Sequence, residues 1–470
     1  MKKTHLVSVL RTFDKKEVRE LRKWLGSPAH NVRQDVRDLF EYLVAGNRLF
    51  SERLLEKEKV HAAIYPGRTF SDAEMRQVIH FLFKAVESFL LHNEMLKDEV
   101  RSQAMLAKVY RQRQLPKLFQ KAMDTARKIQ EQQPYRNDRY FENEYILQHE
   151  NYNYLSGLGR SVPLNLQEVS RSNDIAWLIN KLQVSCIMLS HQKVFKTDYN
   201  MFLLDDVLTR LEGNPVLLEN PAIAINYYSY KALSDSENEE HFQKLKGHID
   251  RHGHLFPPHE IRNTYLLAIN YCIGRLNTGV LAYVREAFDL YRQGLAKNIF
   301  LENGTLSRFT FRNIVAIGLQ LGEYDWVEHF IHAYSPFLDE KHRDSFVQFN
   351  LGHLFFEKKD YEKSMRLIAQ LDHDDILILL VAKTMLLKMY YELDEISALE
   401  SLLGSMRTYL QRKKIMGYHK ANYKNIIRYT KKLLRVAPYS KDQKEKLKAE
   451  IAGANPLTER QWLLEQVDRL

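Results

Sequence analysis

Apolar residues recur at intervals of three and four along almost the whole chain, and residues that break helices are scarce. The 470 residues include only 12 Pro and 18 Gly, below the roughly 5% and 7% that are usual for these two residues. Each amphipathic run ends at a short polar turn or at a turn that contains Pro or Gly, and the two-residue alternation of strands is absent. This pattern predicts an all-α protein.

The first 98 residues are predicted to form a small helical unit. Asp14 with Glu17, and Ser71 with Glu74, have the spacing of capping boxes, in which two side chains satisfy backbone N–H groups at a helix start. A helix is expected over residues 35–44, because its apolar residues share one side. Residues 1–98 therefore form the first predicted domain.

Helices after residue 98 are predicted to come in pairs joined by short turns. Prolines mark these turns, at Pro116, Pro134, Pro163, Pro215, Pro221, Pro257, Pro258 and Pro336. A helix pair cannot bury its apolar faces alone and has to stack on its neighbours. Residues 99–406 are therefore expected to form a helical-repeat α-solenoid, and residues 407–470 a group of basic C-terminal helices.

One segment resembles a tetratricopeptide repeat. Its matching residues are Asn350-Leu351-Gly352, Phe355, Asp360-Tyr361 and Ser364. Val327, Ser364 and Ala398 are 37 and 34 residues apart, close to the 34-residue period of that repeat. The resemblance is degenerate over about residues 300–405, and the whole layout also resembles uncharacterised bacterial helical-repeat proteins. It implies that the first helices of the pairs line a concave surface for a peptide or partner protein.

Asparagines recur in the predicted first or long helices, at Asn143, Asn180, Asn226, Asn270, Asn313 and Asn350. The segment Ala-Ile-Asn-Tyr occurs at 224–227 and again at 268–271. An amide offers both a donor and an acceptor, so a row of them can hold an extended peptide. The predicted partner-binding residues are Asn226, Tyr227, Asn270, Tyr271, Arg312, Asn313 and Asn350. The alternative is that these asparagines are a periodic subset of many and share no role.

The net charge of +10 is concentrated near the C-terminus. Residues 407–448 contain 14 Lys and Arg against Asp442 and Glu445. Charges recur every three or four residues at the predicted anion-binding residues Lys420, Lys424, Arg428, Lys431, Lys432 and Arg435. A nucleic acid or an acidic protein surface would be attracted to them, and the interleaved Tyr418, Tyr429 and Tyr439 could stack on unpaired bases. The alternative is a solvated terminal helix, and basic residues between Arg101 and Arg136 are likewise expected on solvated faces.

Signals for catalysis or metal binding are weak. The acidic cluster at 372–375, which includes His373, is predicted to cap a helix that starts near Ile376. The loop histidines His252, His254 and His259 are expected to be surface residues. No catalytic motif is recognised, so the chain is predicted to be non-enzymatic, with no metal or cofactor.

The expected location is the cytoplasm, without a membrane partner. Cys186 and Cys272 are too few for a disulfide framework. The apolar stretch at the N-terminus ends at Arg11, which is short for a signal peptide. The leading hypothesis is a scaffold or adaptor that binds a peptide or partner protein on the concave face of the solenoid. The alternative is a nucleic-acid-associated or regulatory protein that uses the basic C-terminal helices as an electrostatic anchor.

Overall fold

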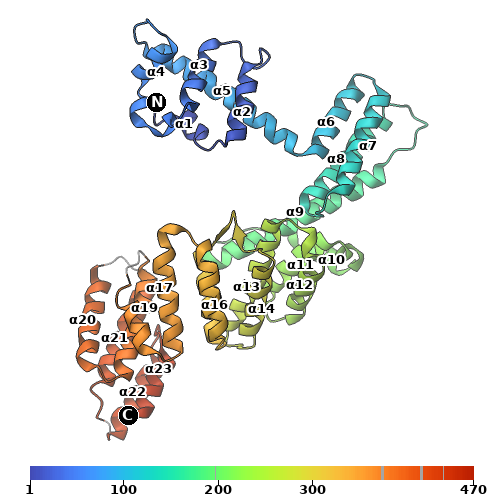
Figure 1. The fold of residues 1–470 in the computed structure, drawn as a ribbon. Coiled ribbons are helices and arrows are strands. Elements are labelled where there is room, and N and C mark those ends of the chain that lie inside the picture. Colours follow the sequence, from blue (N-terminus) through green and yellow to red (C-terminus); the bar gives the residue numbers. More distant parts are fainter. Residues whose placement is uncertain (196, 372–374, 413–416, 438) are drawn as a thin grey trace. The chain divides into compact units, whose positions relative to one another are not determined.

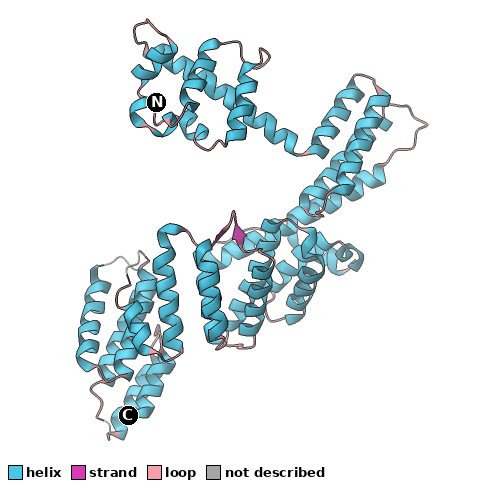
Figure 2. Cartoon of the chain, in the orientation of Figure 1, coloured by secondary structure: helices cyan, strands magenta, loops and turns pink. Residues whose placement is uncertain are grey.

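The computed structural model consists almost entirely of α-helices (Figures 1 and 2). It describes residues 1–195, 197–371, 375–412, 417–437 and 439–470. Within these ranges the only strands are β1 (Leu301–Glu302) and β2 (Thr305–Leu306), which pair antiparallel in a short hairpin. The prediction of an all-α protein is confirmed.

Contacts within the chain define two units, and the division between them falls inside helix α9. Unit 1 comprises Met1–Asn180 and unit 2 comprises Lys181–Leu470. The helices that begin in unit 1 are α1 (His5–Leu10), α2 (Lys15–Gly26), α3 (Gln34–Val44), η1 (Arg48–Phe50), η2 (Glu52–Leu55), α4 (Lys57–Ile64), α5 (Asp72–Lys97), α6 (Glu99–Gln112), α7 (Pro116–Gln132), α8 (Asp138–Leu155) and α9 (Leu166–Phe195). Those of unit 2 are α10 (Leu204–Glu212), η3 (Pro215–Glu219), α11 (Pro221–Ser234), α12 (Glu239–His252), η4 (Gly253–Leu255), α13 (Pro258–Asn277), α14 (Tyr283–Ala296), α15 (Arg308–Gln320), α16 (Tyr324–Tyr334), η5 (Ser335–Phe337), α17 (Glu340–Glu357), α18 (Tyr361–Ile368), α19 (Ile376–Glu392), α20 (Ile396–Arg412), α21 (Gly417–Leu433), α22 (Lys441–Gly453) and α23 (Arg460–Arg469).

Local sequence signals place several helix ends as predicted. At α2 the Asp14 carboxylate accepts from the Glu17 N–H at 2.7 Å, and the Glu17 carboxylate accepts from the Asp14 N–H at 2.9 Å. At α5 Ser71 accepts from the Glu74 N–H at 3.3 Å, but the Glu74 carboxylate lies 3.2 Å from Nε2 of His61. The first capping box is therefore complete, and the second is half formed. Helix α3 begins one residue before the predicted range and ends with it.

Unit 1 contains two separate apolar cores. Helices α1–α5 surround one core that includes Phe40 and Leu82, and helices α6–α8 surround another that includes Ala107, Phe119 and Leu147. The change from one core to the other occurs close to the predicted domain boundary after residue 98. The contact-based division lies elsewhere, at residue 180, and both predicted boundaries stay predictions.

Helices α11 to α20 of unit 2 pack in the order of the sequence (Figure 1). They form the pairs α11/α12, α13/α14, α15/α16, α17/α18 and α19/α20, and each second helix also contacts the first helix of the next pair. The first helices α11 and α13, α15 and α17, and α17 and α19 contact one another. Pro221 and Pro258 are the first residues of α11 and α13, where proline is well tolerated.

Two glycines allow the helices of a pair to approach closely. A Cβ on Gly318 of α15 would lie 2.5 Å from Cγ2 of Val327 on α16, and a Cβ on Gly352 of α17 would lie 2.5 Å from Cδ1 of Ile368 on α18. The hydroxyl of the buried Ser364 donates to the Gly352 carbonyl at 2.7 Å. Larger residues at either glycine would force these helices apart.

The C-terminal helices are joined to the helix pairs by polar contacts. Trp462 on α23 donates its indole N–H to the Glu392 carboxylate at 2.8 Å, and Lys388 of α19 pairs with Glu459 at 2.8 Å. Asn425 of α21 donates to the Pro456 carbonyl at 2.8 Å. The described residues between 407 and 470 therefore pack as part of unit 2. No helix of the described residues has the length and apolar character needed to cross a membrane.

Candidate functional site

The predicted asparagine row does not lie on one surface. Asn350 of α17 is 0% exposed and Asn226 of α11 is half-buried. Each amide donates to the carbonyl oxygen four residues earlier in its own helix, at 2.7 and 2.9 Å respectively. Asn270 and Asn313 are exposed and stay predictions. The assignment of Asn350 to partner binding is wrong, because its side chain is fully buried and presents no surface to a partner.

The two predicted contact tyrosines are core residues. Tyr227 is 4% exposed, and its hydroxyl lies 3.4 Å from Glu212, while burial raises its pKa to about 12. Tyr271 is 2% exposed, stacks on Phe242 at 4.6 Å between ring centroids, and donates to the Ser236 carbonyl at 3.0 Å. Both assignments to partner binding are wrong for the same reason as for Asn350. Arg312 is half-buried and stays a prediction.

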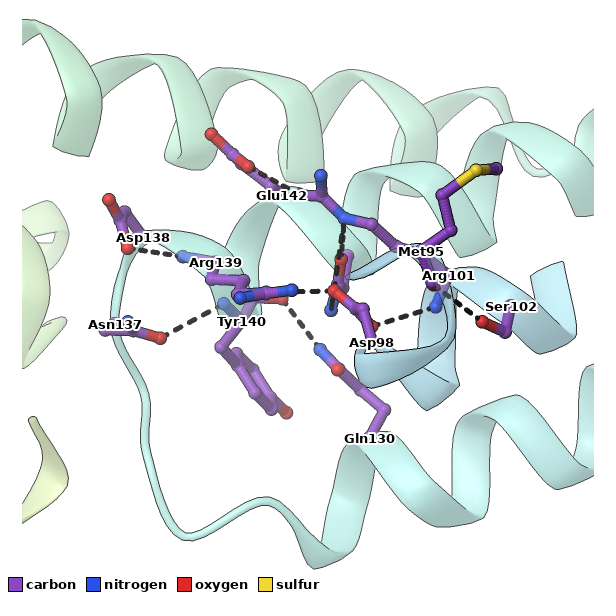
Figure 3. A network of polar contacts seen from close by, with 11 residues as sticks. Met95, Asp98, Arg101, Ser102, Gln130, Asn137, Asp138, Arg139, Tyr140 and Glu142 are labelled. Carbon is purple, nitrogen blue, oxygen red and sulfur yellow. Dashed lines mark hydrogen bonds and ion pairs between the residues drawn. The ribbon is translucent and has the colours of Figure 1, made fainter. Parts of the chain in front are cut away.

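A polar network in unit 1 centres on Asp98, the N-cap of α6 (Figure 3). The Asp98 carboxylate accepts from the Arg101 N–H at 3.0 Å and from Arg139 at 2.9 Å. Arg101 in turn donates to Asn143 at 2.7 Å and pairs with Glu142 at 2.6 Å. Burial acts to raise the pKa of Asp98, but these hydrogen bonds outweigh it and hold the pKa below its usual value. All these charged groups are paired, so the network connects α6 to α8 and leaves no charge for a ligand.

The basic residues between 101 and 136 are partly neutralised by α8. Besides Arg101, Arg111 pairs with the buried Glu150 at 2.6 Å. The expectation that this whole region is a solvated face is wrong for these two arginines, because carboxylates about two turns apart on α8 pair with them. Sequence spacing could not show this, since α7 separates the two helices along the chain.

An open groove of about 570 Å³ lies between the second helices α14 and α16 of unit 2. Its lining residues are Lys246, Asp289, Arg292, Gln293, Leu295, Ala296, Trp326, His329, Phe330 and Tyr334. The rings of Trp326 and Phe330 stack at 5.5 Å, and those of Phe330 and Tyr334 at 5.0 Å. Phe288 meets Trp326 edge to face at 4.7 Å. Trp326 and Tyr334 are partly exposed and form an aromatic wall of this groove, backed by Phe330, which is 1% exposed. We call it the α14/α16 groove.

Several polar groups of the α14/α16 groove have no ionic partner among the described residues. Lys246 pairs with Glu286 at 2.6 Å, whereas Asp289, Arg292 and His329 form no ion pair. Oε1 of Gln293 is buried without a hydrogen-bond partner. The groove thus combines apolar contact area with a carboxylate and a guanidinium that form no ion pair with a described residue, and with an acceptor that has no hydrogen-bond partner. The Arg292 guanidinium lies 5.8 Å from the centroid of the Phe288 ring. This mixture suits a ligand of mixed character such as a peptide.

A row of basic side chains follows one side of α21 and the turn after it. We call Lys420, Lys424, Arg428, Lys431 and Arg435 the basic stripe. Tyr423, Ile426 and Ile427 on the opposite side are buried, as the amphipathic pattern predicts. Lys432 also belongs to the predicted set but leaves this row and pairs with Glu450 of α22. It is therefore not a free anion-binding side chain.

The aspartate cluster and the loop histidines do not form a site among the described residues. Asp375 accepts from the Leu377 N–H at 2.8 Å and caps α19 as predicted, whereas residues 372–374 of the cluster lie outside the described residues. His254 and His259 are exposed. Within the described ranges no three His, Cys, Asp or Glu side chains are placed to hold a metal ion.

The α14/α16 groove and the basic stripe of unit 2 thus carry charged side chains that form no ion pair with a described residue. The charge pattern of the sequence predicts the basic stripe, but nothing in the sequence predicted the α14/α16 groove. Trp326, Phe330 and Tyr334 recur every four residues, which was the available signal, but the same pattern is typical of a core face. Comparisons of the chain with protein-family models, with curated proteins and with solved structures find no match.

Proposed function

We propose that the chain is a non-enzymatic protein-interaction scaffold. In this proposal α11–α20 stack as a tetratricopeptide-like α-solenoid, and the α14/α16 groove binds a segment of a partner protein. The observation that carries the proposal is the groove itself, with an aromatic wall beside charged groups, Asp289, Arg292 and His329, that form no ion pair with a described residue.

The order of helix contacts supports the solenoid. Each helix from α11 to α20 packs on the next one along the chain, and first helices contact first helices in three places. The close approaches at Gly318 and Gly352 lie in two successive pairs. An array of this kind displays surfaces along its length and needs no catalytic group to act.

The side chains of the groove support a peptide as its ligand. Aromatic rings such as Trp326 provide large contact areas at a low cost in conformational entropy and dominate many interfaces. Arg292 and Asp289 can each pair with an opposite charge on the ligand. Oε1 of Gln293 can accept a backbone N–H after a small side-chain rotation. The proposed groove lies between second helices, whereas the asparagine row was expected on first helices.

The test begins with selection of peptides from a displayed random library on the full-length protein. The affinity of the best peptide is then measured for wild type, Arg292→Glu and His329→Glu. His332→Glu is the matched control, because His332 is exposed on the same helix and does not line the groove. We expect each groove variant to weaken binding at least about tenfold and the control to leave it unchanged.

One result would reject the groove. If both groove variants bind the peptide like wild type while Asn270→Ala or Asn313→Ala weakens binding, the peptide occupies the first-helix surface instead. Thermal unfolding of each variant checks the fold. We expect the unfolding temperature to stay close to that of wild type, since all of these side chains are at least partly exposed.

A further inference from the structure

The basic stripe places its cations at regular intervals along a straight line. Residues four apart on an α-helix are about 6 Å apart along its axis, so Lys420, Lys424, Arg428 and Lys431 span about 16 Å. Arg435 continues the row in the turn that follows α21. Lys424, Arg428 and Arg435 are exposed, and the other two are half-buried. One strand of a nucleic-acid duplex carries a charge every 3.4 Å along the axis, so a stripe of this length faces several phosphates.

The positive charge around the stripe is not neutralised by the fold. Ten of the twelve described Lys and Arg residues between 407 and 448 form no ion pair with a described residue. The two exceptions are Lys432, which pairs with Glu450, and Lys448, which pairs with Glu445 and Asp468. In unit 1, by contrast, Arg101 and Arg111 meet carboxylates of α8. The stripe therefore keeps its charge available for a partner outside the described chain.

The surface around the stripe lacks the apolar area that a protein partner would need. Among the described residues from 397 to 470, Tyr439 is the only large hydrophobic side chain that is exposed. Stable protein–protein interfaces have an apolar core, whereas protein–nucleic acid interfaces are more polar and strongly positive. This composition favours a nucleic acid over an acidic protein.

The aromatic side chains near the stripe are not placed to stack on unpaired bases. Tyr423 and Tyr429 are 7% and 6% exposed, and the Tyr429 hydroxyl donates to the Glu450 carbonyl at 3.3 Å. Tyr439 alone is fully exposed, and the side chain of Tyr418 lies outside the described residues. Binding of single strands without sequence preference uses several exposed aromatic rings, on which successive bases stack. The described part of this surface has only one such ring, which disfavours a single strand.

We infer that the basic stripe binds the sugar–phosphate backbone of a double-stranded nucleic acid. The contacts are ionic, span several phosphates and read no bases. This site uses none of the residues of the α14/α16 groove. An experiment that rejects peptide binding in the groove therefore leaves this inference unaffected.

The test measures fluorescence anisotropy of a labelled 25-base-pair duplex of mixed sequence with the full-length protein at 100 mM salt. The stripe variant carries Lys424→Glu, Arg428→Glu and Arg435→Glu. Its control carries Lys23→Glu, Arg210→Glu and Lys341→Glu, which change the net charge equally at exposed positions outside the stripe. We expect the stripe variant to lose at least about 30-fold in affinity and the control to lose less than about threefold.

Two competitors complete the test, a single strand of the same length and a peptide of 20 Asp and Glu residues. The inference predicts that the duplex binds more tightly than either competitor. Tighter binding of the single strand, tighter binding of the acidic peptide, or an equal loss in both triple variants would overturn it. If the stripe variant unfolds at a lower temperature than wild type, the three Gln substitutions replace the three Glu substitutions and the same comparison is made.

Discussion

The α14/α16 groove and the basic stripe belong to the same unit, but they offer opposite chemistry. The groove presents stacked aromatic rings with a few charges of both signs. The stripe presents charges of one sign, with a single exposed large hydrophobic side chain in the whole described stretch from 397 to 470. The aromatic groups of the groove would gain from losing water, whereas the cations of the stripe gain from releasing counterions held by a polyanion. We therefore propose that one unit binds two kinds of partner through separate surfaces.

The largest expected difference between the two surfaces is their response to salt. For five phosphate contacts, raising the salt from 50 to 200 mM should weaken duplex binding about 500-fold. Peptide binding in the groove should change less than about threefold, because much of its contact area is apolar. Anisotropy titrations of both ligands at four salt concentrations measure the two slopes. Equal slopes would show that the two surfaces do not differ as proposed.

The next largest expected effect comes from removing the Trp326 ring of the groove, which should weaken peptide binding but not duplex binding. Trp326→Ala is expected to weaken the selected peptide about 30-fold, as for a buried aromatic anchor, and to leave duplex binding within twofold of wild type. Trp326→Phe keeps a ring against Phe288 and Phe330 and should recover most of the affinity. If Trp326→Ala weakens both ligands equally without unfolding unit 2, the surfaces are not independent.

A smaller effect should distinguish two neighbouring lysines of α21. Lys431 belongs to the stripe and has no ionic partner among the described residues, whereas Lys432 pairs with Glu450. Lys431→Gln should weaken duplex binding about threefold and reduce the salt slope by about one. Lys432→Gln should change neither quantity and serves as the matched control. The reverse order would mean that the ion pair opens and that Lys432, not Lys431, meets the phosphates.

The smallest expected effect is a pH dependence of stability near the groove. His248 lies on α12, two residues from the groove residue Lys246, and burial lowers its pKa to about 4, with further lowering by Arg251 and His252. An unfolded histidine has a pKa of about 6.5, so between pH 6.5 and 4 the unfolded state binds a proton that the folded state does not. Stability should therefore fall as the pH falls through this window.

Thermal unfolding at several pH values tests this effect. Between pH 6.5 and 4, the unfolding temperature of His248→Gln should fall by a few degrees less than that of wild type. The unfolding temperature of the exposed His254→Gln variant should change as in wild type. An unchanged pH dependence in His248→Gln would show that another group titrates.

Features that depend on neighbours in the chain were predictable from the sequence. The Asp14–Glu17 capping box, the ends of α3 and the Asp375 cap involve residues within a few positions of one another, so spacing alone specifies them. The side of α21 that is buried followed from its period of 3.6 residues in the same way. Asn350, Tyr227 and Tyr271 were assigned wrongly because their helices are apolar on several sides, and spacing then does not indicate which side is covered.

The sequence by itself thus determined that the chain is helical, where many helices begin, and that positive charge gathers near the C-terminus. Only the tertiary structure decided which polar groups meet a partner. Glu142 and Glu150 neutralise Arg101 and Arg111 across about 40 residues of chain, whereas Lys424 and Arg428 form no ion pair with a described residue. The α14/α16 groove likewise exists only because two helix pairs are packed side by side. Periodicity is a local property, but burial and ion pairing depend on residues that are distant in the sequence.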